Sequence, residues 1–277
     1  GGISSEAQPV LLTPLILAPL VAATNGRMAP RRAAAISGLA ILLCGGVNAT
    51  ATLLAIVPAV VWLVTRTGWW RRRLTWWWGL AVICATAWWA VPLLLLGRYS
   101  PPFLDWIENA RMVSSPIDLL DVARGTTHWL GHLLTAQGPW WPAGYELVSS
   151  PGLVLATAVV AAAGLAGLAL RAPHRGFLII LLVIGILVIS LPHSGPMSSP
   201  LTEVSQRLLD GPLSPLRNVH KADPLIRLPL SVGLAYLLLR VSAWRPTPRT
   251  RLCPPLLRRY AHAGPSAIAG VIVVSVV

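Results

Sequence analysis

The sequence has few charged residues, and acidic residues are the scarcest of them. Only 11% of its 277 residues are charged, with nine Asp and Glu against 22 Lys and Arg. Because about 25% of the residues of a soluble domain are charged, this composition excludes an ordinary soluble globular protein. Hydrophobic residues make up 55% of the chain, which excludes a disordered polypeptide, since disorder requires low hydrophobicity. The composition therefore indicates an integral membrane protein.

Cysteine is also nearly absent. Cys44 and Cys84 lie inside apolar runs, and Cys253 lies in a basic segment. No pair has CxxC spacing, which excludes a disulfide scaffold and a zinc ribbon. The chain begins without Met or a signal peptide and stops inside an apolar run. We interpret it as an internal piece of a longer protein.

The apolar residues gather in eight runs that resemble membrane spans. They cover residues 9–25, 33–47, 50–65, 75–97, 152–170, 176–192, 228–241 and 262–277. A spanning helix needs about 20 residues, with about 17 as the usual lower limit. The second and third runs are short and are joined by a Gly-Gly turn, which predicts a tight hairpin. The predicted fold class is all-α, a multi-pass transmembrane bundle of about eight spans.

The charges in the connecting segments predict how the spans are oriented. Four connecting segments hold 15 of the 22 basic residues and no acidic residue. All nine acidic residues lie in the alternate segments, 1–8, 98–151 and 193–227. Positive residues are retained on the cytoplasmic side, so these three segments are predicted to lie outside. We expect residues 1–277 to form one transmembrane domain with long outer loops at 98–151 and 193–227.

The first long outer loop predicts two short helices on the membrane surface, at 101–108 and 116–134. Its end, residues 137–142, is rigid and aromatic and suits either sugar stacking or an interfacial anchor, which is the favoured alternative. His128 and His132 are spaced four apart, which would place two imidazoles on one helical face. No Glu follows His128, so the zinc-protease motif is absent. A polar helix face is therefore favoured over a metal site, and no metal is predicted.

The second outer loop ends in an unusual basic cluster. Arg217, Lys221 and Arg227 lie directly outside a predicted span, on the face where topology does not favour positive charge. Arg and Lys form strong charge-assisted hydrogen bonds to phosphate, so a phosphate at the outer membrane surface would explain the cluster. The alternative is headgroup binding or an ion pair with Asp223.

Glu6 is a lone carboxylate just before the first span. One interpretation is an acidic residue in the first turn of a helix capped by Ser4 or Ser5. The other is a general base at the membrane–water boundary, which would have to reach an acceptor hydroxyl. The sequence leaves both open.

Three stretches resemble actinobacterial α-(1→3)-arabinofuranosyltransferases of the AftD type. They are the basic stretch 217–229, the hairpin 43–49 and the Ser-Glu-Ala opening at residues 5–7. The resemblance runs through nearly all of the chain in the same order. It implies a GT-C glycosyltransferase fold in the bacterial plasma membrane, with the active site facing the periplasm.

The resemblance also implies an activity and a set of site residues. It implies transfer of arabinofuranose from decaprenyl-phospho-arabinofuranose to the arabinan of the cell wall (arabinogalactan or lipoarabinomannan), with α-(1→3) branching and inversion. No further cofactor is required. Glu6 would be the base, and Lys221, Arg217 and Arg227 would hold the phosphate. The remaining substrate-binding residues would be Asn48, Asn218, His220 and Asp223.

Two other functions remain as alternatives, a transporter or flippase of a lipid-linked sugar and a non-catalytic membrane anchor. Transporters place charged groups at the bilayer midplane, and no predicted span carries one there. The basic inner face is expected to bind anionic lipids first, and also an acidic cytosolic protein such as an acyl carrier protein. Nucleic acid is not an expected partner, because the basic residues only separate apolar runs.

Overall fold

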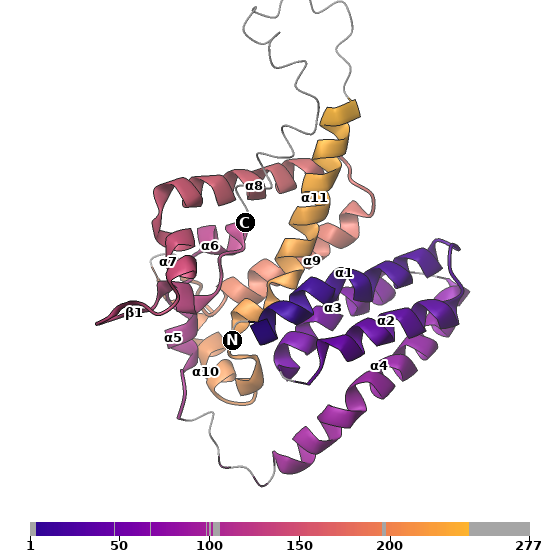
Figure 1. Ribbon diagram of the computed structural model, residues 1–277, viewed down its shortest axis with the longest axis horizontal. Coiled ribbons are helices and arrows are strands. Elements are labelled where there is room, and N and C mark those ends of the chain that lie inside the picture. The colour runs from indigo at the N-terminus through magenta and orange to yellow at the C-terminus, as the bar shows by residue number, and fades with distance from the viewer. Residues whose placement is uncertain are drawn as a thin grey trace, which may run out of the picture.

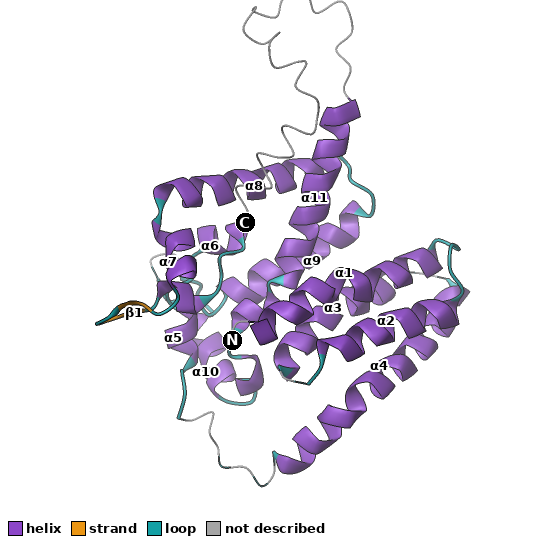
Figure 2. Ribbon diagram, in the orientation of Figure 1, coloured by secondary structure: helices purple, strands orange, loops and turns teal. Residues whose placement is uncertain are grey.

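The structure, a computed structural model, describes residues 4–46, 48–66, 68–97, 99, 101, 106–195 and 198–243. These residues are built almost entirely of helices (Figures 1 and 2). The α-helices are α1 (Ser4–Thr24), α2 (Pro30–Cys44), α3 (Ala49–Thr65), α4 (Trp69–Leu96), α5 (Ala110–Ser114), α6 (Leu119–Arg124), α7 (Pro142–Ser149), α8 (Pro151–Ala169), α9 (Arg175–Ser190), α10 (Thr202–Asp210) and α11 (Pro224–Ala243). Short 3₁₀-helices are η2 (Trp129–His132), η3 (Ser214–Leu216) and η4 (Val219–Ala222), and two antiparallel strands are β1 (Leu134–Thr135) and β2 (Gly138–Pro139).

Long apolar helices confirm the prediction of an all-α membrane protein. Seven of the eight apolar runs coincide with α1–α4, α8, α9 and α11, and the eighth, 262–277, lies outside the described residues. Within the described part of the chain, four helices are long and apolar enough to cross a membrane, namely Glu6–Thr24, Arg72–Leu96, Pro151–Ala169 and Val219–Ala243. The predicted short hairpin is α2 and α3, of 15 and 17 residues. Of the roughly eight predicted spans, the described residues therefore contain four helices of spanning length, and α3 and α9 are shorter apolar helices.

The first four helices pack side by side (Figure 1). Ser37 of α2 is fully buried, and its hydroxyl donates to the carbonyl of Ile16 in α1 at 2.7 Å. The same hydroxyl accepts from the indole of Trp78 in α4 at 2.9 Å. One small polar side chain thus links three helices. Such links suit an apolar environment, in which every polar group must find an internal partner.

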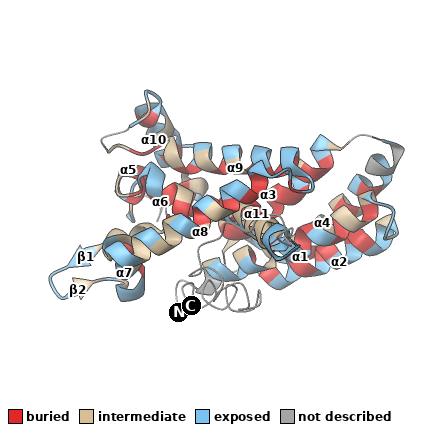
Figure 3. Cartoon of the chain, turned by 90° about the horizontal axis from the view of Figure 1, so that it is seen from above, coloured by how far each residue is buried: buried red, intermediate tan, exposed pale blue. Residues whose placement is uncertain are grey.

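Helices α8 and α11 cross at close range because glycine forms the contact. A Cβ atom on Gly167 would lie 1.8 Å from the carbonyl oxygen of Gly233, and one on Gly164 would lie 2.6 Å from that of Leu230. Both distances are far below van der Waals contact, so no side chain fits there. Small residues at helix interfaces let membrane helices approach closely. Buried residues gather where helices face one another, whereas the outward sides of the helices are exposed (Figure 3).

The outer loops fold differently from the prediction. The helix expected over 116–134 is wrong, because α6 stops at Arg124 and only the short η2 follows. Gly125 ends α6 in the left-handed conformation, with φ 73°, which glycine adopts without strain. Of the helix expected over 101–108, residues 102–105 lie outside the described residues, and residues 106–108 are not helical.

The basic stretch before the last described span is also more ordered than expected. Helix α11 begins at Pro224, four residues before the predicted run, and η4 directly precedes it. Proline suits the first position of a helix, because its fixed φ matches and its missing N–H has no helical partner there. Asp223 and Arg227 therefore lie one turn apart at the start of a helix.

Candidate active site

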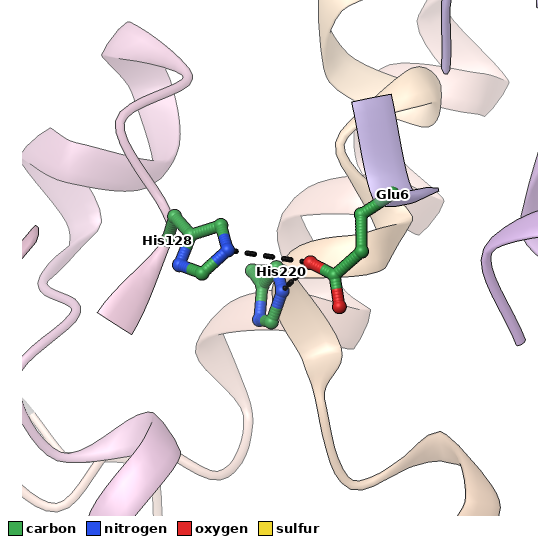
Figure 4. A group of neighbouring side chains, drawn as sticks. All are labelled: Glu6, His128 and His220. Atoms are coloured by element: carbon green, nitrogen blue, oxygen red, sulfur yellow. Dashed lines mark hydrogen bonds and ion pairs between the residues drawn. The ribbon is translucent and has the colours of Figure 1, made fainter. Parts of the chain in front are cut away.

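Four donors from three separate segments converge on the carboxylate of Glu6. Oε1 of Glu6 lies 3.2 Å from Nδ2 of Asn48 and 3.3 Å from Nζ of Lys221. Oε2 lies 2.9 Å from Nε2 of His220 and 3.3 Å from Nε2 of His128 (Figure 4). These residues are up to 215 positions apart in the sequence, so the tertiary fold creates the site.

Local structure explains where Glu6 and its donors lie. Glu6 lies in the first turn of α1, where the helix dipole favours a negative charge. Asn48 is the N-cap of α3 and accepts from the amide of Ala51 at 3.0 Å, which fixes the orientation of its amide group. His220 and Lys221 belong to η4, which precedes α11. Glu6 thus lies in a first helical turn, as one interpretation predicted, and is also the centre of a polar cluster. Its role as a general base stays a prediction.

The two imidazoles lie against each other, with ring centroids 4.2 Å apart. His128 also meets the ring of Trp141 edge-on, at 5.3 Å between centroids. Nδ1 of His128 accepts from the backbone amide of Leu130 at 3.3 Å. This contact assigns the proton of the neutral ring to Nε2, which then donates to Glu6.

The ligand atoms of Glu6, His128 and His220 all lie within 4.8 Å of one another, a spacing that would suit a metal ion. The chemistry of the donors does not fit one. A metal binds a ring nitrogen that carries no proton, and the opposite nitrogen then normally donates a hydrogen bond, whereas Nδ1 of His128 accepts one. The Lys221 ammonium also lies 3.3 Å from the same carboxylate. The arrangement fits a hydrogen-bonded carboxylate.

The loop that carries His128 is fastened to the start of α11. The buried hydroxyl of Thr127 donates to Oδ1 of Asp223, and Oδ2 of Asp223 accepts from Nε of Arg227 at 2.9 Å. Arg227 also donates to the carbonyl of Gly125. Asp223 therefore positions His128 through the backbone of its neighbour. The Arg227 side chain remains 54% exposed.

A second buried cluster holds the same loop from the other side. Oδ1 of Asp121 accepts from Arg124 at 2.8 Å and from Thr126 at 3.0 Å. His132 lies 3.6 Å from the other oxygen of Asp121. Burial raises the pKa of Asp121 and lowers the pKa of His132, which is therefore neutral at neutral pH. His128 and His132 thus serve different carboxylates, and their expected place on one helical face is wrong.

Arg217 and Asn218 have structural contacts instead of facing Glu6. The buried Arg217 guanidinium pairs with Asp210 at 3.2 Å and donates to the carbonyls of Leu209 and Glu108. Asn218 donates to the carboxylate of Glu108 at 2.9 Å and accepts from the Trp129 indole at 3.2 Å. These bonds join the two outer loops to each other, so Arg217 and Asn218 brace the loops. A phosphate role for Arg217 therefore stays a prediction that these contacts do not support.

The structure thus brings together four of the eight predicted site residues, Glu6, Asn48, His220 and Lys221. Asp223 and Arg227 form an adjoining pair, and Arg217 and Asn218 brace the loops behind it. Sequence reasoning missed His128 as a partner of Glu6. The sequence singled out His128 for its spacing from His132, and a spacing within one loop does not identify a partner 122 residues away.

Comparison with known proteins decides the family. The family model described as alpha-(1→3)-arabinofuranosyltransferase, N-terminal GT-C domain, matches residues 1–277. The chain belongs to this family. It is 46% identical over 254 residues to the alpha-(1→3)-arabinofuranosyltransferase of Mycolicibacterium smegmatis, covering 90% of this chain. It is 42% identical over 270 residues to the same enzyme of Mycobacterium tuberculosis, covering 95% of this chain.

Solved structures of arabinofuranosyltransferase AftD from mycobacteria support the GT-C assignment. One cryo-EM structure matches with a TM-score of 0.64 and 38% identity, covering 98% of this chain and 16% of that one. A structure of a mutant matches with the same TM-score and 36% identity, covering 99% of this chain and 16% of that one. The chain spans 18% of the length of each of the two curated family members.

Proposed function

We propose that this chain provides the catalytic centre for transfer of an arabinofuranosyl residue from a polyprenyl-phosphate donor to arabinan. The convergence of Asn48, His128, His220 and Lys221 on Glu6 is the observation that carries the proposal. A carboxylate held among donors at the end of apolar helices supports the proposal, because a lipid-linked sugar would present its headgroup at the membrane surface. Membership of the arabinofuranosyltransferase family supports arabinose as the sugar.

The proposed chemistry is a single inverting displacement. The acceptor hydroxyl attacks the anomeric carbon of arabinose, and Glu6 takes the hydroxyl proton. The bond from that carbon to the phosphate oxygen breaks, and its electron pair leaves with the polyprenyl phosphate. Lys221 and the half-exposed Arg227 would stabilise the charge that develops on the phosphate. We propose α-(1→3) branching as the linkage and decaprenyl phosphate as the lipid.

We also propose that Glu6 faces the periplasm and that the basic ends of the helices face the cytoplasm. The helix ends opposite to Glu6 are basic: Arg27, Arg66 and Arg171 follow the ends of α1, α3 and α8. Arg31 and Arg72 lie in the first turns of α2 and α4. The excess of positive charge on cytoplasmic segments supports this orientation. Anionic lipids are the first expected partners of this face, and an acidic cytosolic protein such as an acyl carrier protein remains a prediction.

Transfer assays of Glu6→Gln and Lys221→Ala test the proposal. The assay uses the full chain in detergent, a synthetic polyprenyl-phospho-arabinofuranose donor and an oligoarabinan acceptor. Glu6→Gln keeps the size of the side chain but removes the base, so we expect a loss of about 10²-fold or more. Lys221→Ala removes the charge beside the phosphate and should cause a loss of similar size.

Glu203→Gln is the matched control, because Glu203 is an exposed acid on α10, in the outer loop 193–227. It should transfer arabinose at the wild-type rate. Wild-type rates in Glu6→Gln and Lys221→Ala would contradict the site. Movement of the lipid-linked sugar across a vesicle membrane, without product, would favour a flippase, and neither activity would favour a membrane anchor.

A further inference from the structure

The Glu6 carboxylate has no lone pair left for a substrate. A carboxylate offers about four lone-pair positions to hydrogen-bond donors. Asn48 and Lys221 occupy Oε1, and His128 and His220 occupy Oε2. A general base must lie within hydrogen-bond reach of the proton that it takes. An acceptor hydroxyl can therefore reach Glu6 only after one of these four donors has moved away.

Three of the four donors are held by other contacts. Asn48 is fixed as the cap of α3 through Ala51. His128 is held by the Leu130 amide and lies between the rings of Trp141 and His220. His220 is buried, at 5% exposed, and its ring lies against that of His128, with centroids 4.2 Å apart.

Lys221 differs from these three donors, because its side chain, which is 10% exposed, makes no second hydrogen bond or ring contact within the described residues. Among the described residues, Glu6 is the one ion-pair partner of its ammonium group. The ammonium is a point charge on a flexible four-carbon stem, so it can exchange partners without a movement of the backbone. A phosphate anion competes with this carboxylate for the ammonium, because three other donors already share the negative charge of the carboxylate.

We propose that Lys221 exchanges partners during the reaction cycle, pairing with Glu6 in the resting protein and with the donor phosphate once the lipid has bound. The exchange opens one lone pair on Oε1 of Glu6 for the acceptor hydroxyl. The donor must then bind before the acceptor can bind productively. This inference rests on the proposed function, since it concerns the same carboxylate and the same lipid phosphate.

The exchange is consistent with the balance of protons and electrons in the transfer. The hydroxyl proton moves to the vacated position on Oε1, and the hydroxyl oxygen forms the new bond to the anomeric carbon. The departing phosphate keeps the electron pair of the broken bond and remains paired with the Lys221 ammonium, which stays protonated throughout. When the polyprenyl phosphate leaves, Glu6 releases its proton to water and Lys221 returns to it.

Binding of a fluorescent oligoarabinofuranoside, with and without polyprenyl phosphate, tests the exchange. Polyprenyl phosphate carries the anion but no sugar, so it can move Lys221 without any reaction. With the wild-type full chain in detergent, saturating polyprenyl phosphate should tighten acceptor binding at least about fivefold, the lower end of usual coupling between sites. By reciprocity, the acceptor should tighten polyprenyl phosphate binding by the same factor. An acceptor affinity that polyprenyl phosphate leaves unchanged would overturn the exchange.

The variant Lys221→Met sharpens the test. It leaves one lone pair of Oε1 permanently open, so the acceptor should bind without polyprenyl phosphate as tightly as it binds the wild type with it. The coupling should then vanish. Arg111→Met removes an exposed outer-loop cation on α5 and should keep the full coupling. Coupling that persists in Lys221→Met would overturn the inference even if the wild type behaves as expected.

Transfer measured on the same wild-type preparation separates the two proposals. Product formation without coupling overturns the exchange and leaves the proposed function in place. Absence of product from wild-type protein overturns the proposed function, and the exchange with it.

Discussion

The hydrogen bond from Thr127 to Asp223 is the contact that places His128 beside Glu6. Thr127 is fully buried, so its hydroxyl cannot contact a substrate. We predict that Thr127→Val lowers kcat for arabinose transfer by about tenfold or more, because small displacements of a catalytic group have large effects on rate. The KM for the lipid donor should change little, because Lys221 is not displaced. Steady-state kinetics of the full chain measures both values.

Two further variants separate positioning from general destabilisation. Thr127→Ser keeps the hydroxyl and should restore most of the lost kcat. Thr135→Val changes an exposed threonine in the β-hairpin and should behave as the wild type. Equal kcat for Thr127→Val and the wild type would show that the Asp223 contact does not position the site.

Residue types identified part of this site in advance but could not identify all of it. A lone lysine and a lone carboxylate, Lys221 and Glu6, are unusual just outside apolar runs, and that rarity marks them in the sequence. Arg217 looked equally unusual, yet its guanidinium is buried against Asp210 and backbone carbonyls. The sequence shows that a charge is present but not which of several partners it meets.

At the scale of elements, the crossing of α8 and α11 depends on glycine. We predict that Gly167→Ala destabilises the protein by roughly 1–3 kcal/mol, the usual effect of overpacking, because the new Cβ would overlap the Gly233 carbonyl. Thermal unfolding of the purified full chain in detergent, followed by tryptophan fluorescence, measures the change. Arabinose transfer should fall in parallel with the folded fraction, since η4, which holds His220 and Lys221, directly precedes α11.

Gly152→Ala is the control on the same helix, because a Cβ there would meet no atom within 4 Å. This variant should be as stable as the wild type or slightly more stable, since alanine favours a helix more than glycine does. If both alanine variants melt at the same temperature, close glycine packing does not hold the two helices together.

Apolar run length predicted the elements in the membrane better than those in the outer loops. A run such as 152–170 has no stable alternative to a helix in lipid, where the backbone must satisfy its own hydrogen bonds. The outer stretch 116–134 has such alternatives. Gly125 and the side-chain hydrogen bonds of Thr126 and Thr127 compete with the helix there. The bond of Thr126 to Asp121 is local, whereas that of Thr127 to Asp223 is a tertiary contact.

At the scale of the whole molecule, the two ends of the helices differ in charge. The resting site keeps its cations paired with Glu6 and Asp223, whereas exposed arginines such as Arg171 and Arg175 cluster at the opposite helix ends. Positive charge resists translocation across the membrane during insertion. This asymmetry predicts orientation independently of the chemistry at Glu6, so the two can be tested separately.

Cysteine labelling in spheroplasts tests that orientation. In a full chain without Cys44, Cys84 and Cys253, a single cysteine is introduced at Gln137 in the exposed β-hairpin or at Pro173 in the exposed turn between α8 and α9. We predict that a membrane-impermeant maleimide labels Gln137→Cys in intact spheroplasts and labels Pro173→Cys only after permeabilisation. The physical reason is that the turn beside Pro173 carries Arg171 and Arg175, and positive residues are retained on the cytoplasmic side. The reverse pattern would place Glu6 on the cytoplasmic side, where it could not meet a donor headgroup in the outer leaflet, and the proposed periplasmic transfer would be wrong.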